Sequence, residues 1–78
     1  MQTIFLYHKG KVVEQGMCFN LTDSLCQLIS INTEKLSINV LQSTLGKSVI
    51  KELEYNDLPL EFEFFIFTQY SKISRKPK

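Results

Sequence analysis

Alternation of apolar and polar residues runs through most of the chain and predicts strands joined by short turns. Residues 2–8 are mainly β-branched and aromatic, and they predict the first strand. Residues 9–11 form a Gly-containing turn, and residues 12–19 predict the returning strand. Gly16 in the middle of that strand is typical of a bulge or of a close backbone approach. The first quarter of the chain is therefore predicted to be a β-hairpin.

The next segment has helical rather than alternating spacing. Thr22 is a suitable N-cap, and Asp23 interacts favourably with the dipole of a helix that starts there. The apolar residues that follow at helical spacing are Leu25, Leu28 and Ile29. We expect this segment to be the main helix and to bury its apolar stripe against the sheet.

The second half of the chain returns to strand-like patterns. Residues 35–41 alternate strictly and predict a half-buried strand. Residues 42–59 are ambiguous, because the stretch 48–55 fits either a short helix or a short strand before the break at Pro59. Residues 60–70 are apolar on both faces over much of their length, which is typical of a central strand.

This order of elements predicts an α+β fold, in which a β-grasp-like, mixed ββαββ sheet packs on one main helix. The domain is expected to span residues 1–71, followed by a basic flexible tail over residues 72–78. The predicted core packs the apolar stripe of the helix against the inward positions of the first and last strands: Ile4, Leu6, Phe62, Phe64 and Ile66.

Composition limits the function classes. A chain of 78 residues allows one domain with a small core, which excludes most enzyme scaffolds. Hydrophobic residues make up 44% of it, with six Phe and three Tyr, so the chain is too apolar to be disordered. Ala is absent, and this favours strands over a helical bundle.

The formal net charge of +1 conceals an uneven distribution. Residues 1–71 contain five basic and eight acidic residues and so carry a net charge of −3. The other positive charges lie near the end of the chain: Lys72, Arg75, Lys76 and Lys78. These four are candidate contacts for phosphate or anionic lipid, although such an end is more often a solvated terminus. An acidic body argues against a typical nucleic-acid-binding domain, which carries its basic face on the fold itself.

We find no sequence motif that carries chemistry. Gly46 to Ser48 resemble the end of a phosphate-binding loop, but the glycine that such a loop needs five positions earlier is Leu41. His8 is the only histidine and lies at the end of a predicted strand, where a surface role is usual. We therefore expect neither an enzyme nor a bound cofactor or metal.

The two cysteines bear on the cellular compartment. Cys18 and Cys26 form no Cys-x-x-Cys unit, and a single histidine does not complete a zinc site with them. We expect reduced thiols in an intracellular protein, either cytoplasmic or nuclear. No signal peptide is evident, and no apolar stretch approaches the roughly 18 residues that span a membrane.

Several segments resemble ubiquitin-like proteins. The opening MQTIFLYHKGK is similar to the first strand of that family and its turn, and Thr22-Asp23, followed by Leu25 and Ile29, resembles its helix start. The segment ELEYNDLPLEFEFFIF resembles the family's closing pattern, in which a Leu-x-x-Tyr-Asn-like turn precedes the last strand. The resemblance covers residues 1–70 and implies the β-grasp fold.

The sequence departs from that family at two places. Conjugated members end in Gly-Gly, whereas this chain ends in RKPK at residues 75–78, which implies a protein that is not conjugated. The family's recognition patch uses an exposed apolar residue on the third strand, where this chain has Ser37 and Asn39. Binding by ordinary ubiquitin-receptor domains is therefore not expected.

Four aromatic residues are candidates for contact with a partner. If the first and last strands are neighbours, the residues that line up on the open face of the sheet are Phe5, Tyr7, Phe65 and Phe67. The alternative is that the strand register differs by one, or that residues 42–58 or the tail cover these side chains.

We expect a non-catalytic protein–protein interaction module or a small subunit of a larger assembly. The aromatic face would bind a protein partner or a second copy. One alternative is a peripheral nucleic-acid or ribonucleoprotein component that uses the basic tail, and another is a small viral or mobile-element inhibitor of a host protein.

Overall fold

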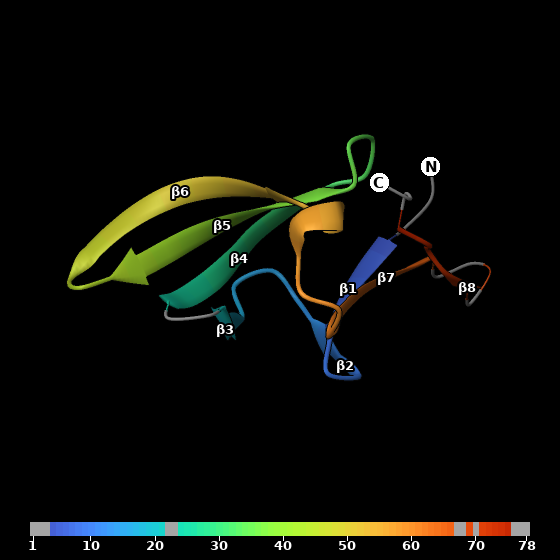
Figure 1. Ribbon diagram of the computed structural model, residues 1–78, viewed down its shortest axis with the longest axis horizontal. Helices are drawn as coiled ribbons and strands as arrows, with labels where there is room; N and C mark the ends of the chain where they lie inside the picture. Colours follow the sequence, from blue (N-terminus) through green and yellow to red (C-terminus); the bar gives the residue numbers. More distant parts are fainter. Residues whose placement is uncertain (1–3, 22–23, 67–68, 70, 76–78) are drawn as a thin grey trace.

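The computed structural model describes residues 4–21, 24–66, 69 and 71–75, which fold almost entirely into antiparallel strands (Figure 1). The strands are β1 (Ile4–His8), β2 (Lys11–Val13), β3 (Cys18–Leu21), β4 (Ser24–Asn32), β5 (Ser37–Thr44), β6 (Lys47–Glu54), β7 (Phe62–Ile66) and β8 (Ser71–Lys72), and the 3-10 helix η1 spans Tyr55–Asp57. Sheet A has the strand order β2-β1-β7-β8, and sheet B has the order β3-β4-β5-β6.

The α+β prediction is wrong. The described residues contain no α-helix, and both sheets are antiparallel throughout, so neither the main helix nor the mixed sheet is present. The predicted helix is instead strand β4, while its predicted cap and first turn at residues 22–23 lie outside the described residues.

A β-bulge explains why β4 looks helical in the sequence. Pairing with β5 shifts by one residue between Leu28 and Ser30, so that the extra residue is Ile29. Leu28 and Ile31 consequently both face the core, although they are three residues apart and not two. Apolar residues separated by three positions are the signature of a helix face, and the bulge produces the same spacing in a strand.

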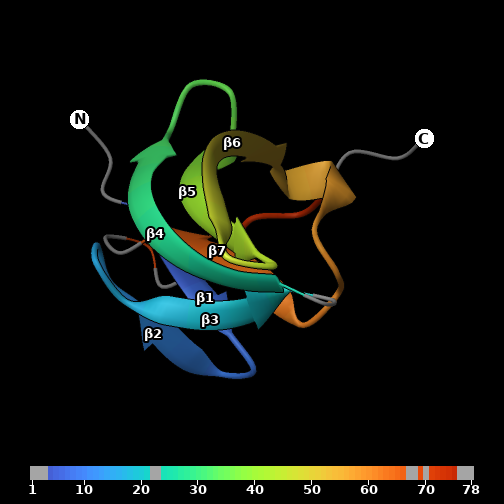
Figure 2. The ribbon, with the colours of Figure 1, turned by 90° about the vertical axis from the view of Figure 1, so that its left-hand side faces the viewer.

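The predicted N-terminal hairpin is confirmed, and its returning strand divides between the two sheets. In the β1–β2 turn, Lys9 and Gly10 both have positive φ, as a type I′ turn requires. After β2 the chain bends at residues 14–17, where the Gly16 amide donates to the Leu28 carbonyl at 2.8 Å. This corner joins sheet A to sheet B, and the strands curl around a shared interior (Figure 2).

The core lies between the two sheets. The side chains with no measurable exposure include Leu6 from β1, Phe62 and Phe64 from β7, and Ile38 and Val40 from β5. These inward positions of β1, β5 and β7 follow the sequence prediction. Leu25 does not, because it lies on the outer face of β4 and is 49% exposed.

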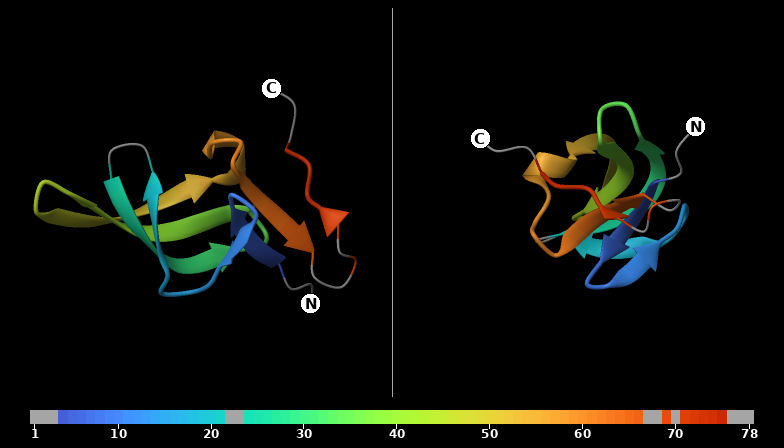
Figure 3. Two further views of the ribbon diagram at one scale, coloured as in Figure 1. Left: turned by 90° about the horizontal axis from the view of Figure 1, so that it is seen from below. Right: turned by 90° about the vertical axis from the view of Figure 1, so that its right-hand side faces the viewer.

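The β5–β6 hairpin extends beyond the part of the fold that contains sheet A (Figures 1 and 3). Leu45 and Gly46 at its tip have φ values of 51° and 78°, which again fit a two-residue type I′ turn. This resolves the ambiguity over residues 48–55 in favour of a strand that ends at Glu54 and is followed by η1. β6 is therefore a long edge strand of sheet B.

Residues 71–75 are in contact with the body of the fold. β8 pairs with β7, and the Ile73 amide donates to the Phe64 carbonyl at 2.7 Å. β7 thus lies between β1 and β8, as predicted for a central strand. Whether residues 72–78 move as a tail in solution stays a prediction, but residues 72–75 make specific contacts here.

Candidate functional site

The outer surface of sheet A carries three of the four candidate aromatic residues. Phe5 and Tyr7 project from β1, and Phe65 projects from β7. Phe5 is directly opposite Phe65 in the ladder, and the rings of Tyr7 and Phe65 lie 4.7 Å apart between centroids. We call these three residues the aromatic face. The fourth candidate, Phe67, lies outside the described residues.

Strand alternation fixes the orientation of the aromatic face. Leu6 and Phe64, the neighbours of these aromatics along β1 and β7, are fully buried in the core, so the aromatics point outward. Each aromatic of the face is partly exposed. The outward positions that alternation predicts for Phe5, Tyr7 and Phe65 are thus observed, with β1 and β7 paired antiparallel.

A pocket borders the aromatic face at Phe5. β2 pairs only with Leu6 to His8 of β1, so the first residues of β1 extend past the end of their partner. A pocket of about 390 Å³ occupies this end of the sheet, and its walls are mostly apolar. It is lined by Phe5, Val13, Glu14, Gln15, Leu28, Ser30 and Ile31. The face and the pocket together form a surface with one flat part and one concave part.

An ion pair marks the other border of the aromatic face. Lys72 of β8 lies opposite Phe65, and its Nζ is 3.5 Å from a carboxylate oxygen of Glu63. Both side chains are substantially exposed, so this pair contributes little to stability. It supplies a polar rim of the kind that surrounds apolar contact surfaces.

Of the four predicted anion contacts, the structure describes Lys72 and Arg75. Arg75 donates hydrogen bonds to the carbonyl oxygens of Leu58, Pro59 and Phe62, and its guanidinium lies 4.6 Å from the Tyr55 ring centroid. The Arg75 guanidinium, a candidate phosphate contact in the sequence, thus holds residues 71–75 against the fold. Lys76 and Lys78 lie outside the described residues.

His8 is a packing residue in this fold. Its ring stacks on Phe62 at 4.2 Å between centroids and lies 5.9 Å from the ring of Phe19. Its Nε2 is 3.4 Å from Glu61 Oε1, in a geometry that makes no hydrogen bond. No cluster of three or more His, Cys, Asp or Glu side chains suited to a metal occurs among the described residues.

The cysteines are in different environments. Cys18 is exposed on β3, whereas Cys26 is buried on β4, and both are free thiols. Burial raises the pKa of the Cys26 thiol above its ordinary value of 9.0, and the positive charge of Lys51 opposes that effect. The described residues also include no helix of the length and apolarity that would cross a membrane.

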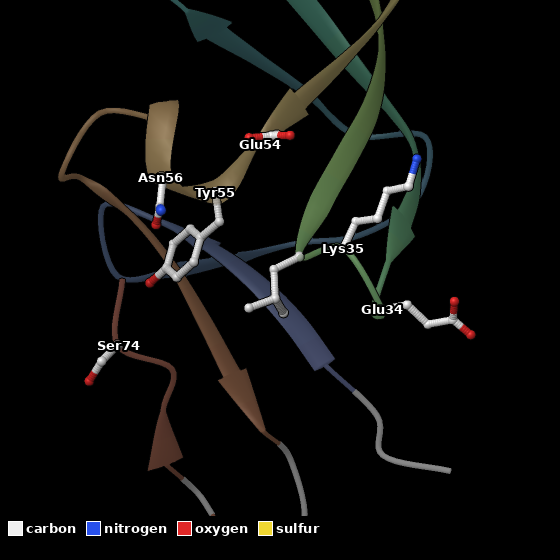
Figure 4. Close-up of a pocket in the computed structure, with 7 residues that line it drawn as sticks. Glu34, Lys35, Glu54, Tyr55, Asn56 and Ser74 are labelled. Atoms are coloured by element: carbon white, nitrogen blue, oxygen red, sulfur yellow. The ribbon is translucent and has the colours of Figure 1, made fainter. Parts of the chain in front are cut away.

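A second pocket, of about 290 Å³, is polar and lies where the β4–β5 turn meets η1 (Figure 4). Its lining residues are Glu34, Lys35, Leu36, Glu54, Tyr55, Asn56 and Ser74. In Figure 4, Glu34 and Lys35 lie on one side, and Tyr55 and Asn56 lie on the other. Its charged groups are therefore spread around the rim and do not converge on one point.

Three exposed apolar side chains on one hairpin of the described chain were not predicted from the sequence. Leu45, Val49 and Ile50, on the β5–β6 hairpin, are 98%, 50% and 71% exposed. A signal for this hairpin is the Leu45-Gly46 pair flanked by short alternating runs, which is typical of a hairpin turn. Because residues 48–55 fitted a short helix and a short strand equally well, the sequence did not define this hairpin.

No protein-family model, curated protein or solved structure matches this chain. The comparisons therefore neither support nor oppose the ubiquitin-like resemblance of the sequence.

Proposed function

We propose that the protein is a non-catalytic interaction module that binds a protein partner through the aromatic face of sheet A. The observation that carries the proposal is the alignment of Phe5, Tyr7 and Phe65 on one outer surface, next to an apolar pocket. Aromatic side chains in such positions supply large contact areas at low entropic cost.

The surroundings of the aromatic face support this assignment. The face is part of a sheet held by a buried core, so it is rigid before a partner arrives, which lowers the entropic cost of binding. The pocket at Phe5 has room for an apolar side chain of the partner, and the Glu63–Lys72 pair provides a polar rim. A rigid aromatic face, an apolar pocket and a polar rim together suit binding of a partner and not catalysis.

The test compares Tyr7→Ser and Phe65→Ser with Leu60→Ser, a control that removes an apolar side chain 85% exposed in the loop before β7. Partners are captured from cells of the source and quantified by mass spectrometry, and circular dichroism verifies the fold. Tyr7→Ser and Phe65→Ser should each weaken binding about 30-fold, equivalent to about 2 kcal/mol. Leu60→Ser should retain full binding.

Two results would remove the proposal. The first is that the folded Tyr7→Ser and Phe65→Ser variants capture the same partners as the unaltered chain. The second is binding that weakens steeply with added salt, because phosphate contacts depend strongly on ionic strength and an aromatic interface does not. That result would favour nucleic acid as the partner.

A further inference from the structure

The outer edge of β6 is open. Within the described part of the chain, β6 pairs with β5 alone and forms one border of sheet B. Seven of its eight residues are exposed, which is typical of a strand without a second neighbour. An edge of this length presents unpaired backbone N–H and C=O groups to which another strand is able to pair.

The two faces of β6 differ in charge. Residues opposite each other in an antiparallel ladder share a face, so Lys51 opposite the buried Val40 lies on the inner face. The inner face of β6 carries Lys47, Val49, Lys51 and Leu53, and the outer face carries Ser48, Ile50, Glu52 and Glu54. The inner face of the edge is therefore positive.

On the outer face Glu52 has polar partners, whereas the two lysines of the inner face have no carboxylate partner among the described residues. Glu52 accepts a hydrogen bond from the Ser37 hydroxyl at 3.0 Å and lies 4.0 Å from Lys35 Nζ. Neither Lys47 nor Lys51 lies within ion-pair distance of a carboxylate in residues 4–21, 24–66, 69 and 71–75. The inner face of the edge thus carries two cations without a carboxylate partner in the described residues, four positions apart along β6.

These charges argue against a second copy as the occupant. Two copies of β6 in one continuous antiparallel sheet would be related by an axis normal to that sheet, so inner-face residues would oppose inner-face residues. Centring the pairing on Val49 places Lys47 opposite Lys51, and centring it on Lys51 places that lysine opposite itself. Centring it on Ile50 puts Lys51 diagonal to both lysines of the copy, and centring it on Glu52 opposes two carboxylates. Each arrangement brings like charges together, which is destabilising.

We propose that the open edge of β6 binds an extended segment of a partner protein that carries acidic side chains opposite Lys47 and Lys51 and an apolar side chain opposite Ile50. Backbone hydrogen bonds would add a fifth strand to sheet B, and the acidic side chains would determine which segments bind. Ile50, which is 71% exposed, and its neighbour Leu41 on β5 would provide an apolar contact on the outer face.

The experiment uses two labelled synthetic peptides as long as β6. The probe is Thr-Val-Thr-Glu-Ile-Val-Thr-Glu, which pairs antiparallel with Glu opposite both lysines, and the control peptide has Lys in place of Glu. Fluorescence anisotropy measures affinity, and NMR locates the affected backbone amides. The protein variants are Lys51→Glu and, as a control for net charge, Lys11→Glu on the exposed start of β2.

The acidic peptide should bind at least about tenfold more tightly than the basic one and should shift amides of β6 and not of β1 or β7. Lys51→Glu should remove that preference or reverse it, while Lys11→Glu should leave it within about twofold. Equal binding of the two peptides, absence of binding by both, or shifts confined to β1 and β7 would overturn the proposal. A dimer of the unaltered chain that joins through β6 would also overturn it.

Discussion

Replacing Tyr55 with Phe removes one buried oxygen atom and should destabilise the fold out of proportion to that change. The Tyr55 hydroxyl accepts a hydrogen bond from the Phe64 amide at 3.2 Å and donates one to the Ile73 carbonyl at 2.9 Å. Ile73 in turn donates its amide to Phe64. The Tyr55 hydroxyl therefore bridges the backbone of β7 and of Ile73. It accepts from the Phe64 amide in the place where a regular ladder would have a carbonyl.

The expected loss of unfolding free energy in Tyr55→Phe comes from the two backbone groups that lose their hydrogen-bond partner. Phe64 is fully buried, so its amide would lose its acceptor without access to water, at a cost of about 1–3 kcal/mol. The Ile73 carbonyl is only partly buried and would cost less, because water replaces the donor. We expect a total of about 2–3 kcal/mol, which is a large share of the roughly 4–12 kcal/mol typical of a domain of 78 residues.

Tyr7→Phe is the matched control for this measurement. It removes the same atom from a partly exposed tyrosine of the aromatic face and should change the free energy of unfolding by less than about 0.5 kcal/mol. Urea unfolding at constant m-value gives both differences. Amide hydrogen exchange should also show faster exchange at Phe64 in Tyr55→Phe. If the two variants have equal stability within error, the hydroxyl does not hold β7 to the terminal segment and the reasoning fails.

Three further predictions concern the core, the terminal segment and the thiols. Leu28→Ala should lower the unfolding free energy by about 2–5 kcal/mol and Leu25→Ala by less than about 1 kcal/mol, whereas a buried helical stripe would make both severe. Arg75→Ala should cost about 2 kcal/mol in urea unfolding, and Arg75→Lys should recover at most half, because lysine lacks the guanidinium fork; an unchanged midpoint for Arg75→Ala would contradict this. Ellman's reagent near neutral pH should modify Cys18 quickly and Cys26 only after unfolding. Because the pKa of the Cys26 thiol is raised in the folded state, this thiol's contribution to stability should decline as pH rises above about 9, and a gain there would contradict the assignment.

Local patterns in the sequence predicted the parts of this fold that depend on neighbouring residues. The first hairpin, the strand predicted over residues 35–41, which is observed as β5 over residues 37–44, and the central β7 all follow from simple alternation and turn chemistry. The outward positions of Phe5, Tyr7 and Phe65 follow from the same alternation. These features need only the period of a strand, and that period is visible in the residues themselves.

The features that the sequence did not predict depend on contacts between distant segments. The bulge in β4 is defined by its pairing with β5, and without that partner the spacing of Leu28 and Ile31 fits a helix equally well. Arg75 appears in a run of basic residues, and only the folded chain brings it to the carbonyl oxygens near Pro59 and Phe62. Charge and periodicity alone contain no information about those contacts.

The two proposed surfaces also differ in whether they depend on contacts between distant segments, and experiments are therefore able to separate them. The aromatic face requires β1 to pair with β7, which joins residues about sixty positions apart, and the Tyr55 hydroxyl and Arg75 hold the terminal segment against β7. The β6 edge belongs to a hairpin of adjacent strands whose pairing is local. Loosening residues 71–75 should therefore weaken binding at the aromatic face before it affects the edge of β6. We expect Tyr55→Phe to reduce capture by the aromatic face at temperatures at which the acidic peptide still binds β6 with unchanged affinity. Parallel loss of both activities with temperature would show that the two sheets open as a single cooperative unit.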